Sequence, residues 1–158
     1  MRTIIYDLED TSYLKFKDDD NLISTVDKHC IGCFSCWVRN PLRCIHNDKI
    51  STSGKSLLES DELIIISKYT YGSYSSRIKR IIERSIAYVE PFFTLRNGEI
   101  HHKSRINKKL DFKVYFYGKD IDSDDMDTAG KFVMANMNNL NTNKPEIFFY
   151  DDYKEIVI

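Results

Sequence analysis

DELIIISKYTYGSYSS, residues 61–76, combines the clearest strand of the chain with the loop that follows it. Residues 63–66 are apolar at consecutive positions, which is typical of a strand buried on both faces of a parallel sheet. The loop at 68–76 carries three tyrosines, one glycine and four serine or threonine residues. Because ligands of doubly wound sheets bind beyond the carboxyl ends of the strands, this loop is a candidate ligand site. The alternative is a tyrosine-rich surface loop that caps the following helix.

Four other segments have strand character and alternate with helical patterns. These strands are expected at residues 3–8, 21–27, 112–118 and 146–151. Apolar residues at helical spacing predict helices at about 75–89 and 124–140. The buried stripe of the second helix is expected to consist of Met126, Ala129, Val133, Met137 and Leu140. The alternation predicts a single α/β domain, residues 1–158, with a parallel sheet covered on both faces.

The composition limits the classes of function. The formal net charge of the 158 residues is −1, and no basic stripe indicates nucleic-acid binding. The longest apolar runs, of about six residues, fall far short of the ~20 that span a bilayer. The N-terminal MRTIIYDLED lacks the pattern of a signal peptide. We therefore expect a cytoplasmic protein without nucleic-acid or membrane partners, in which clustered cysteines favour metal or redox chemistry over disulfides.

All cysteines of the chain lie in CIGCFSCWVRNPLRC, residues 30–44. Separated by two, two and seven residues, they are Cys30, Cys33, Cys36 and Cys44. Three cysteines at this close spacing with a fourth nearby are typical of ferredoxin-type [4Fe–4S] segments. Zinc needs four tetrahedral ligands, which come more often from two separated Cys-x2-Cys pairs. Structural thiols covered by Phe34 and Trp37 are the third alternative, and the spacing leaves all three open.

The chain resembles the NAD(P)H-dependent FMN reductases and iron–sulfur flavoproteins of the flavodoxin-like superfamily. The resemblance rests on CIGCFSCW (30–37), Cys44, DELIIISKYTYGSYS (61–75) and IKRIIERS (78–85), where Lys79 and Arg84 fit the family pattern. It covers about residues 22–90 well, and the remainder only in the order of strands and helices. The proline of the family's ring-binding loop is replaced by Lys68.

The resemblance implies a flavodoxin-like three-layer α/β/α fold with a five-stranded parallel sheet. It implies a flavin-dependent (FMN) oxidoreductase or electron-transfer flavoprotein, and, if the chain is an enzyme, one like an NAD(P)H-dependent FMN reductase. The cysteines would hold a [4Fe–4S] cluster, and a redox partner protein is expected. The residues expected to bind the cofactor are Ser67, Lys68, Tyr69, Thr70, Tyr71, Gly72, Tyr117 and Gly118. A homodimer is expected through the helix at 75–89, with Tyr88, Phe92 and Phe93 in the interface.

The loop after the first strand departs from the family. EDTSYLKFKDDDN, residues 9–21, has no glycine and contains five acidic residues. The phosphate of FMN needs bare amides and hydroxyls at a helix N-terminus, and about a dozen residues cannot hold such a loop together with a full helix. We expect weak recognition of the FMN phosphate. The alternative function is a flavodoxin-like scaffold that has lost FMN binding and acts as a non-enzymatic interaction module.

Four further segments are given structural interpretations. STSGKS (51–56) has Lys49 where a phosphate-binding loop needs its first glycine, so it is expected to start a helix with hydroxyl caps. His101 and His102 could be metal ligands, but neighbouring side chains point in different directions and seldom share one ion. Both are therefore expected in a solvated basic loop. The run at 18–20 is expected to be a solvated acidic loop. Residues 92–110 are expected to form a long polar excursion with a turn at Asn97-Gly98.

Overall fold

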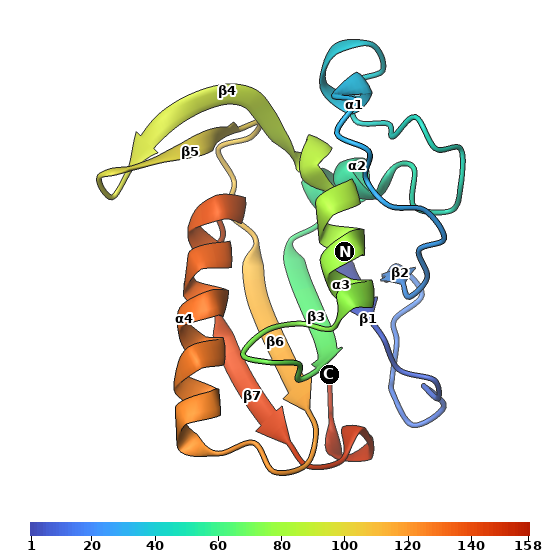
Figure 1. Ribbon diagram of the computed structural model, residues 1–158. Helices are drawn as coiled ribbons and strands as arrows, with labels where there is room; N and C mark the ends of the chain where they lie inside the picture. Colours follow the sequence, from blue (N-terminus) through green and yellow to red (C-terminus); the bar gives the residue numbers. More distant parts are fainter.

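The computed structural model describes residues 1–158, and its centre is a five-stranded sheet (Figure 1). The strand order is β2-β1-β3-β6-β7, and every neighbouring pair is parallel. The strands are β1 (Arg2–Tyr6), β2 (Asn21–Ile23), β3 (Glu62–Lys68), β6 (Asp111–Tyr117) and β7 (Glu146–Tyr150). The expected five-stranded parallel sheet is confirmed, with a second strand shorter than predicted.

The α-helices that pack on the sheet lie on one of its faces. The helical segments are α1 (Ser35–Val38), α2 (Ser53–Glu59), α3 (Ser76–Arg84), η1 (Ile86–Tyr88), α4 (Ser123–Leu140) and η2 (Tyr153–Glu155). Leu57 of α2, Ile81 of α3 and Val133 of α4 belong to one buried cluster with Ile65 and Phe112 of the sheet. α3 ends earlier than predicted because its last residues form η1 and Val89 begins another strand.

The other face of the sheet is covered without a long helix. Ile4, Ile64 and Tyr115 point to this side and pack with Leu14 of the first loop and Ile156 near the C-terminus. No helix lies between β1 and β2, as the short connection predicts. The third layer of the expected α/β/α arrangement therefore consists of residues 7–20 and the segment around η2. It leaves several tyrosine and phenylalanine rings of the sheet only partly buried.

Residues 89–104 form an antiparallel hairpin that extends away from the main sheet (Figure 1). Its strands are β4 (Val89–Arg96) and β5 (Glu99–Ser104). Asn97 and Gly98 have φ of 53° and 81°, which confirms the predicted turn and matches the left-handed backbone of tight hairpins. The expected irregular excursion is wrong for these residues, and so is the solvated loop at His101. That side chain is buried between Glu99 and Asn139.

Two helix predictions need correction in detail. Ala129 and Val133 are fully buried as expected, but Met126 is 40% exposed. The loop after β3 contacts the N-terminal part of α4, where the Tyr69 hydroxyl donates to Asp125 and Gly72 lies against Thr128. α2 begins in STSGKS as predicted, although the Thr52 side chain forms no capping hydrogen bond.

No helix in the structure has the length and hydropathy needed to cross a membrane.

Candidate functional site

A polar pocket lies at the carboxyl ends of the strands, where the strand order reverses between β1 and β3. The cavity has a volume of about 380 Å³. Its wall is formed by Asp7, Glu9, Lys68, Ser75, Ser76, Arg77, Tyr117 and Tyr153. This is the position at which doubly wound sheets bind ligands. We call it the edge pocket.

Asp7 is one of four charged residues that line the edge pocket, with Glu9, Lys68 and Arg77. Its carboxylate accepts the backbone N–H of Lys68 at 3.1 Å and the hydroxyl of Tyr117 at 3.1 Å. Burial and the neighbouring Asp7 carboxylate raise the pKa of Tyr117, so this hydroxyl stays protonated and donates. Arg77 donates to the backbone carbonyl of Asp7 at 3.4 Å. The backbone N–H of Lys68 and the hydroxyl of Tyr117 are thus turned toward a carboxylate of the protein itself, whereas Arg77 contacts a backbone carbonyl.

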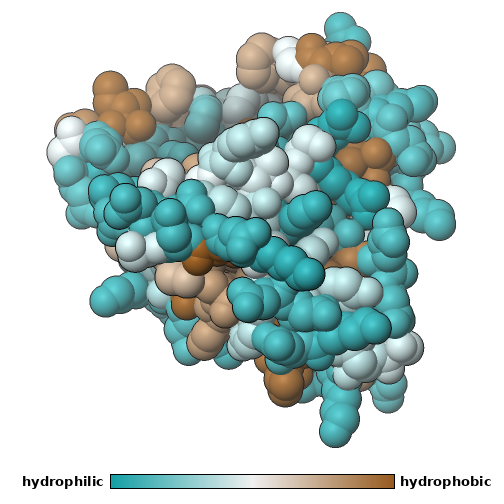
Figure 2. Space-filling view, turned by 60° about the horizontal axis from the view of Figure 1, so that its bottom comes forward, coloured by the Kyte–Doolittle hydropathy of each residue, from teal (hydrophilic) through white to brown (hydrophobic).

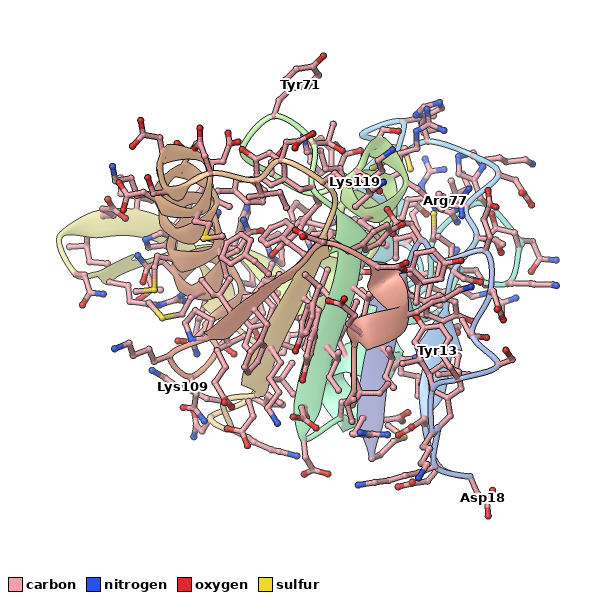
Figure 3. The ribbon with its side chains drawn as sticks, turned by 90° about the horizontal axis from the view of Figure 1, so that it is seen from below. Tyr13, Asp18, Tyr71, Arg77, Lys109 and Lys119 are labelled. Carbon is pink, nitrogen blue, oxygen red and sulfur yellow. The ribbon has the colours of Figure 1, made fainter.

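The other end of the predicted cofactor loop is a tight turn. Thr70 and Ser73 exchange backbone hydrogen bonds of 3.0 and 3.1 Å. Between them Tyr71 is 99% exposed, and Figure 3 shows its side chain pointing away from the body of the protein. Gly72 has φ +73°, and a Cβ there would lie 2.5 Å from Thr128 Cγ2. The turn therefore presses directly on α4.

Ser67 and Tyr69 fix this loop to its neighbours. The Ser67 hydroxyl is buried and accepts the N–H of Ser75 at 2.9 Å, which joins β3 to the start of α3. The Tyr69 hydroxyl donates to Asp125 at 2.6 Å, and burial together with that carboxylate raises its pKa. The N–H of Gly118 donates to the carbonyl of Tyr150 at 3.0 Å. These contacts are structural, and Tyr69, Gly72 and Gly118 do not line the edge pocket.

The structure thus brings only part of the predicted cofactor set to one cavity. Lys68 and Tyr117 line the edge pocket, whereas Tyr71 points into solvent. Sequence reasoning did not assign Asp7, Glu9, Arg77 or Tyr153 to this site. Asp7 directly follows β1, where a phosphate loop would begin, and that position was the available signal. Tyr153 had no signal, because only the fold brings the C-terminal segment to this edge.

A second cavity is lined by all four cysteines and is mainly apolar. It has a volume of about 460 Å³. Its lining is Cys30, Ile31, Gly32, Cys33, Phe34, Cys36, Trp37, Cys44, His46, Glu83, Arg84 and Ile86. Cys30 and Cys33 are exposed, which contradicts the interpretation of these residues as buried structural thiols. Burial, followed by the nearby Cys44, Cys30 and Cys33, raises the pKa of the Cys36 thiol.

Arg84 places a buried guanidinium at this cysteine cavity. Its side chain is fully buried and forms two hydrogen bonds, of 2.5 and 2.8 Å, with the Asp48 carboxylate. The Arg84 Nε has no hydrogen-bond partner within the protein. Both the Asp48 pair and the Cys44 thiol raise the pKa of Arg84, so it remains charged. The cavity is thus apolar, with four thiols, and its charged lining includes Glu83 and the Arg84 guanidinium that Asp48 pairs.

The thiols are not gathered around a single point. No three histidine, cysteine, aspartate or glutamate side chains lie close enough together to hold one metal ion. Tetrahedral zinc, with Zn–S bonds of about 2.3 Å, would need sulfurs less than ~4 Å apart. The arrangement as it stands therefore contains no preformed zinc site, and no other metal-binding group is preformed.

Comparisons with known proteins agree on the fold alone. No protein-family model matches the sequence, and a search of curated proteins finds no match. Among solved structures, an FMN-dependent NADH-azoreductase from Bacillus anthracis str. Ames Ancestor, in complex with FMN, superposes with a TM-score of 0.50. The match covers 94% of this chain and 86% of the azoreductase, at 11% sequence identity. The chain has a flavodoxin-like fold.

Proposed function

We propose that this flavodoxin-like protein is an electron carrier whose four cysteines hold an iron–sulfur cluster. The observation that carries the proposal is the cysteine cavity, because every cysteine of the chain lines one apolar space beside a buried guanidinium. When bound, such a cluster supplies one-electron transfer. The spacing of the cysteines supports a cubane cluster more than a single ion.

The residues around the cavity have distinct roles in this proposal. Cys30, Cys33, Cys36 and Cys44 supply the thiolate ligands. Arg84 offsets part of their negative charge, because a fixed cation in an apolar site interacts more strongly than in water. Ile31 and Ile86 contribute apolar surface to the lining of the cavity. The exposed cysteines Cys30 and Cys33 mark the side through which an electron would enter or leave.

Anaerobic reconstitution with iron and sulfide tests the proposal. The wild-type chain should bind about four irons and four acid-labile sulfides and become brown. Cys33→Ser should lose iron and sulfide together, because a cubane with a missing protein ligand is exposed and labile. Asn40→Ser, an exposed change in the same loop, is the matched control and should keep both. A colourless protein with one equivalent of zinc, or a protein without metal after reconstitution, would overturn the proposal.

A flavin oxidoreductase is the second candidate function. It is favoured by the superposition on an FMN-dependent NADH-azoreductase and by the edge pocket at the strand switch point. The flavin ring would lie against Tyr69, Tyr71 and Gly72, and NAD(P)H would be the electron donor. The edge pocket offers no strong positive charge to the phosphate of FMN, because Asp7 and Glu9 balance Lys68 and Arg77, and Asp7 already accepts the N–H of Lys68 and the hydroxyl of Tyr117. Flavin recognition would therefore rest on the ring, with no contribution from the phosphate.

The two candidates differ in what the purified protein should contain. A flavin carrier should yield a yellow protein whose flavin is released by heat or acid, with Tyr69→Ala weakening its retention. An electron carrier with a cluster should give iron and sulfide without flavin. A redox partner protein and a cytoplasmic location belong to both candidates, since four free thiols in one cavity suit a reducing compartment.

A further inference from the structure

A cavity of about 350 Å³ lies between the C-terminal ends of α3 and α4, two helices on the same face of the sheet (Figure 1). We call it the helix cavity. Because both helices run back along the strands that precede them, it lies at the opposite end of the sheet from the edge pocket. Its apolar wall consists of Ile82, Ile86, Val89 and Leu140. A mainly apolar cavity with a few polar groups is typical of small-molecule sites.

Tyr88 is the most buried of the polar residues that line the helix cavity. Its side chain is 1% exposed and belongs to the core, so the expectation that Tyr88 lies in a helix-mediated homodimer interface is wrong. Its hydroxyl has no hydrogen-bond partner within the protein. Burial raises the pKa of Tyr88 to about 12, so the hydroxyl stays protonated and can donate. Because a buried hydroxyl without a partner is unfavourable, a ligand that accepts its proton gains affinity.

Two asparagines of α4 offer the complementary halves of an amide to the same cavity. The Asn136 side-chain nitrogen donates to the carbonyl of Phe132 at 2.9 Å, which leaves its oxygen to accept. The Asn139 oxygen lies 3.2 Å from His101 Nδ1, which leaves its nitrogen to donate. A carboxamide carries the matching pair, an N–H donor and a carbonyl acceptor. No lysine or arginine lines the helix cavity, whereas Glu83 does, so an uncharged ligand is favoured over an anion.

A smaller cavity of about 170 Å³ adjoins the helix cavity between the same two helices. The two cavities share Ile82, Glu83 and Asn136. Tyr74 lines the smaller one, and its fully buried hydroxyl also has no hydrogen-bond partner within the protein. Phe132 lines it too, with its ring 4.9 Å from the Tyr74 ring. The space between α3 and α4 thus combines apolar walls with two unpartnered phenol hydroxyls.

The hairpin of β4 and β5 borders the helix cavity through His102. Further along the hairpin, Leu95 and Ile100 are 76% and 72% exposed, and Figure 2 shows apolar side chains at the surface over the hairpin, at the upper left. Phe92 and Phe93 are each 68% exposed, and the homodimer expected through them stays a prediction. None of these four side chains lines the helix cavity, so a ligand site there does not depend on what covers the hairpin.

We propose that the helix cavity binds a small uncharged molecule in which a carboxamide is attached to an apolar ring. The ring lies against the apolar wall, and the amide carbonyl accepts the hydroxyl of Tyr88. Asn136 accepts the amide N–H, and Asn139 provides a second donor to the carbonyl. Glu83 and Ile86 also line the cysteine cavity, but the proposed site does not depend on what the cysteines bind.

Titration of the nitrogen-labelled full chain with benzamide, followed by NMR of its amide signals, tests the proposal. The signals of Ile82 and Ile86 and the side-chain amides of Asn136 and Asn139 should shift and saturate. Benzoate should bind about tenfold more weakly or worse, because its carboxylate meets Glu83 without a cation. Tyr88→Phe should weaken benzamide by about fivefold through the loss of one hydrogen bond. The same variant should bind toluene, which has no acceptor, as the wild type does.

Tyr71→Phe is the matched control, because it removes a tyrosine hydroxyl that is 99% exposed and lies outside the helix cavity. It should bind benzamide as the wild type does. Urea denaturation should show no loss of stability in Tyr88→Phe, since the hydroxyl removed has no partner. The proposal is overturned by shifts that do not saturate or that lie elsewhere on the protein. Equal affinity for benzamide in the wild type and Tyr88→Phe, or for benzoate and benzamide in the wild type, overturns it as well.

Discussion

The carboxylate of Asp7 accepts the hydroxyl of Tyr117 at 3.1 Å, across the carboxyl ends of β1 and β6. It also accepts the N–H of Lys68, the residue that ends β3. Both donors are therefore engaged by an anion that the chain provides itself. We expect this arrangement to oppose the binding of a phosphate at this position.

Removing the Asp7 carboxylate should create phosphate recognition. In the wild type we expect similar dissociation constants for FMN and riboflavin, measured by quenching of flavin fluorescence. Asp7→Ser should tighten FMN by about tenfold or more, because loss of one repulsive charge at a phosphate is worth about 1–2 kcal/mol. Riboflavin affinity should stay unchanged. The readout is the ratio of the two constants.

Asp10→Ser provides the control for this experiment. Asp10 lies in the same loop but outside the edge pocket, where its carboxylate accepts the N–H of Ser12. The Asp10→Ser substitution removes one negative charge, as Asp7→Ser does, but it leaves the Lys68 N–H and the Tyr117 hydroxyl bonded to Asp7. An equal gain in FMN affinity for both variants would show that general charge, and not the Asp7 position, governs phosphate rejection.

The contact between Gly72 and Thr128 should be measurable as a coupling energy. Gly72→Ala places a Cβ 2.5 Å from Thr128 Cγ2 at φ +73°, and we expect a loss of about 3 kcal/mol in the free energy of unfolding. Thr128→Ser removes that methyl group but keeps the hydroxyl that donates to Asp124. The double variant should regain about half of the loss, because only the backbone strain remains. Urea denaturation of the four proteins gives the cycle, and strictly additive effects would contradict the contact.

The sequence predicts the central strands of the sheet well, because a strand that is buried on both faces has apolar residues at consecutive positions. β3 and β6 are recognisable in this way, whereas β7 is an edge strand that is only partly buried. The turn at Asn97-Gly98 follows from backbone conformation alone. The hairpin strands beside that turn were missed because their outer face is apolar and their inner face polar. Such a sequence has apolar residues typical of a core strand and polar residues typical of a loop. The polar inner face is explained by its contacts with the end of α4, which cannot be read from the hairpin sequence.

The candidate site was predictable only where one segment supplies it. The four cysteines lie within fifteen residues, and the structure places them around one cavity. The edge pocket instead combines residues from the first loop, the start of α3 and the C-terminal segment. Asp20 shows the same limit. It was interpreted as part of a solvated run, but its side chain is fully buried against Arg2.

The Asp20 pair predicts a specific dependence of stability on pH. Arg2 donates to Asp20 at 2.6 and 2.8 Å, and these hydrogen bonds hold the pKa of the carboxyl below its usual value. A lowered pKa in the folded state means that the stabilisation is complete above the unfolded pKa of about 3.9 and is lost as the pH falls through the folded value. Asp20→Asn should therefore cost about 2 kcal/mol at neutral pH and progressively less below about pH 4.

Asp18→Asn is the control for the acidic run. Asp18 points into solvent, away from the body of the protein in Figure 3. Its substitution should change the free energy of unfolding by less than about 0.5 kcal/mol at any pH. Urea denaturation of both variants at neutral and acidic pH measures the two effects. A cost of Asp20→Asn that stays constant down to acidic pH would contradict the assignment to its ionised form.

The pair between Arg84 and Asp48 should dominate the stability of the cysteine cavity wall. Arg84→Gln leaves the Asp48 carboxylate, which is 19% exposed, without its buried partner, and we expect a loss of about 3 kcal/mol. Arg84→Lys keeps the charge but not the two parallel hydrogen bonds, so its cost should be smaller. Thermal and urea denaturation of the metal-free protein measure both. Equal costs for the two variants would show that the geometry of the guanidinium matters more than its charge. A loss below about 1 kcal/mol for Arg84→Gln would contradict a structural role for the pair.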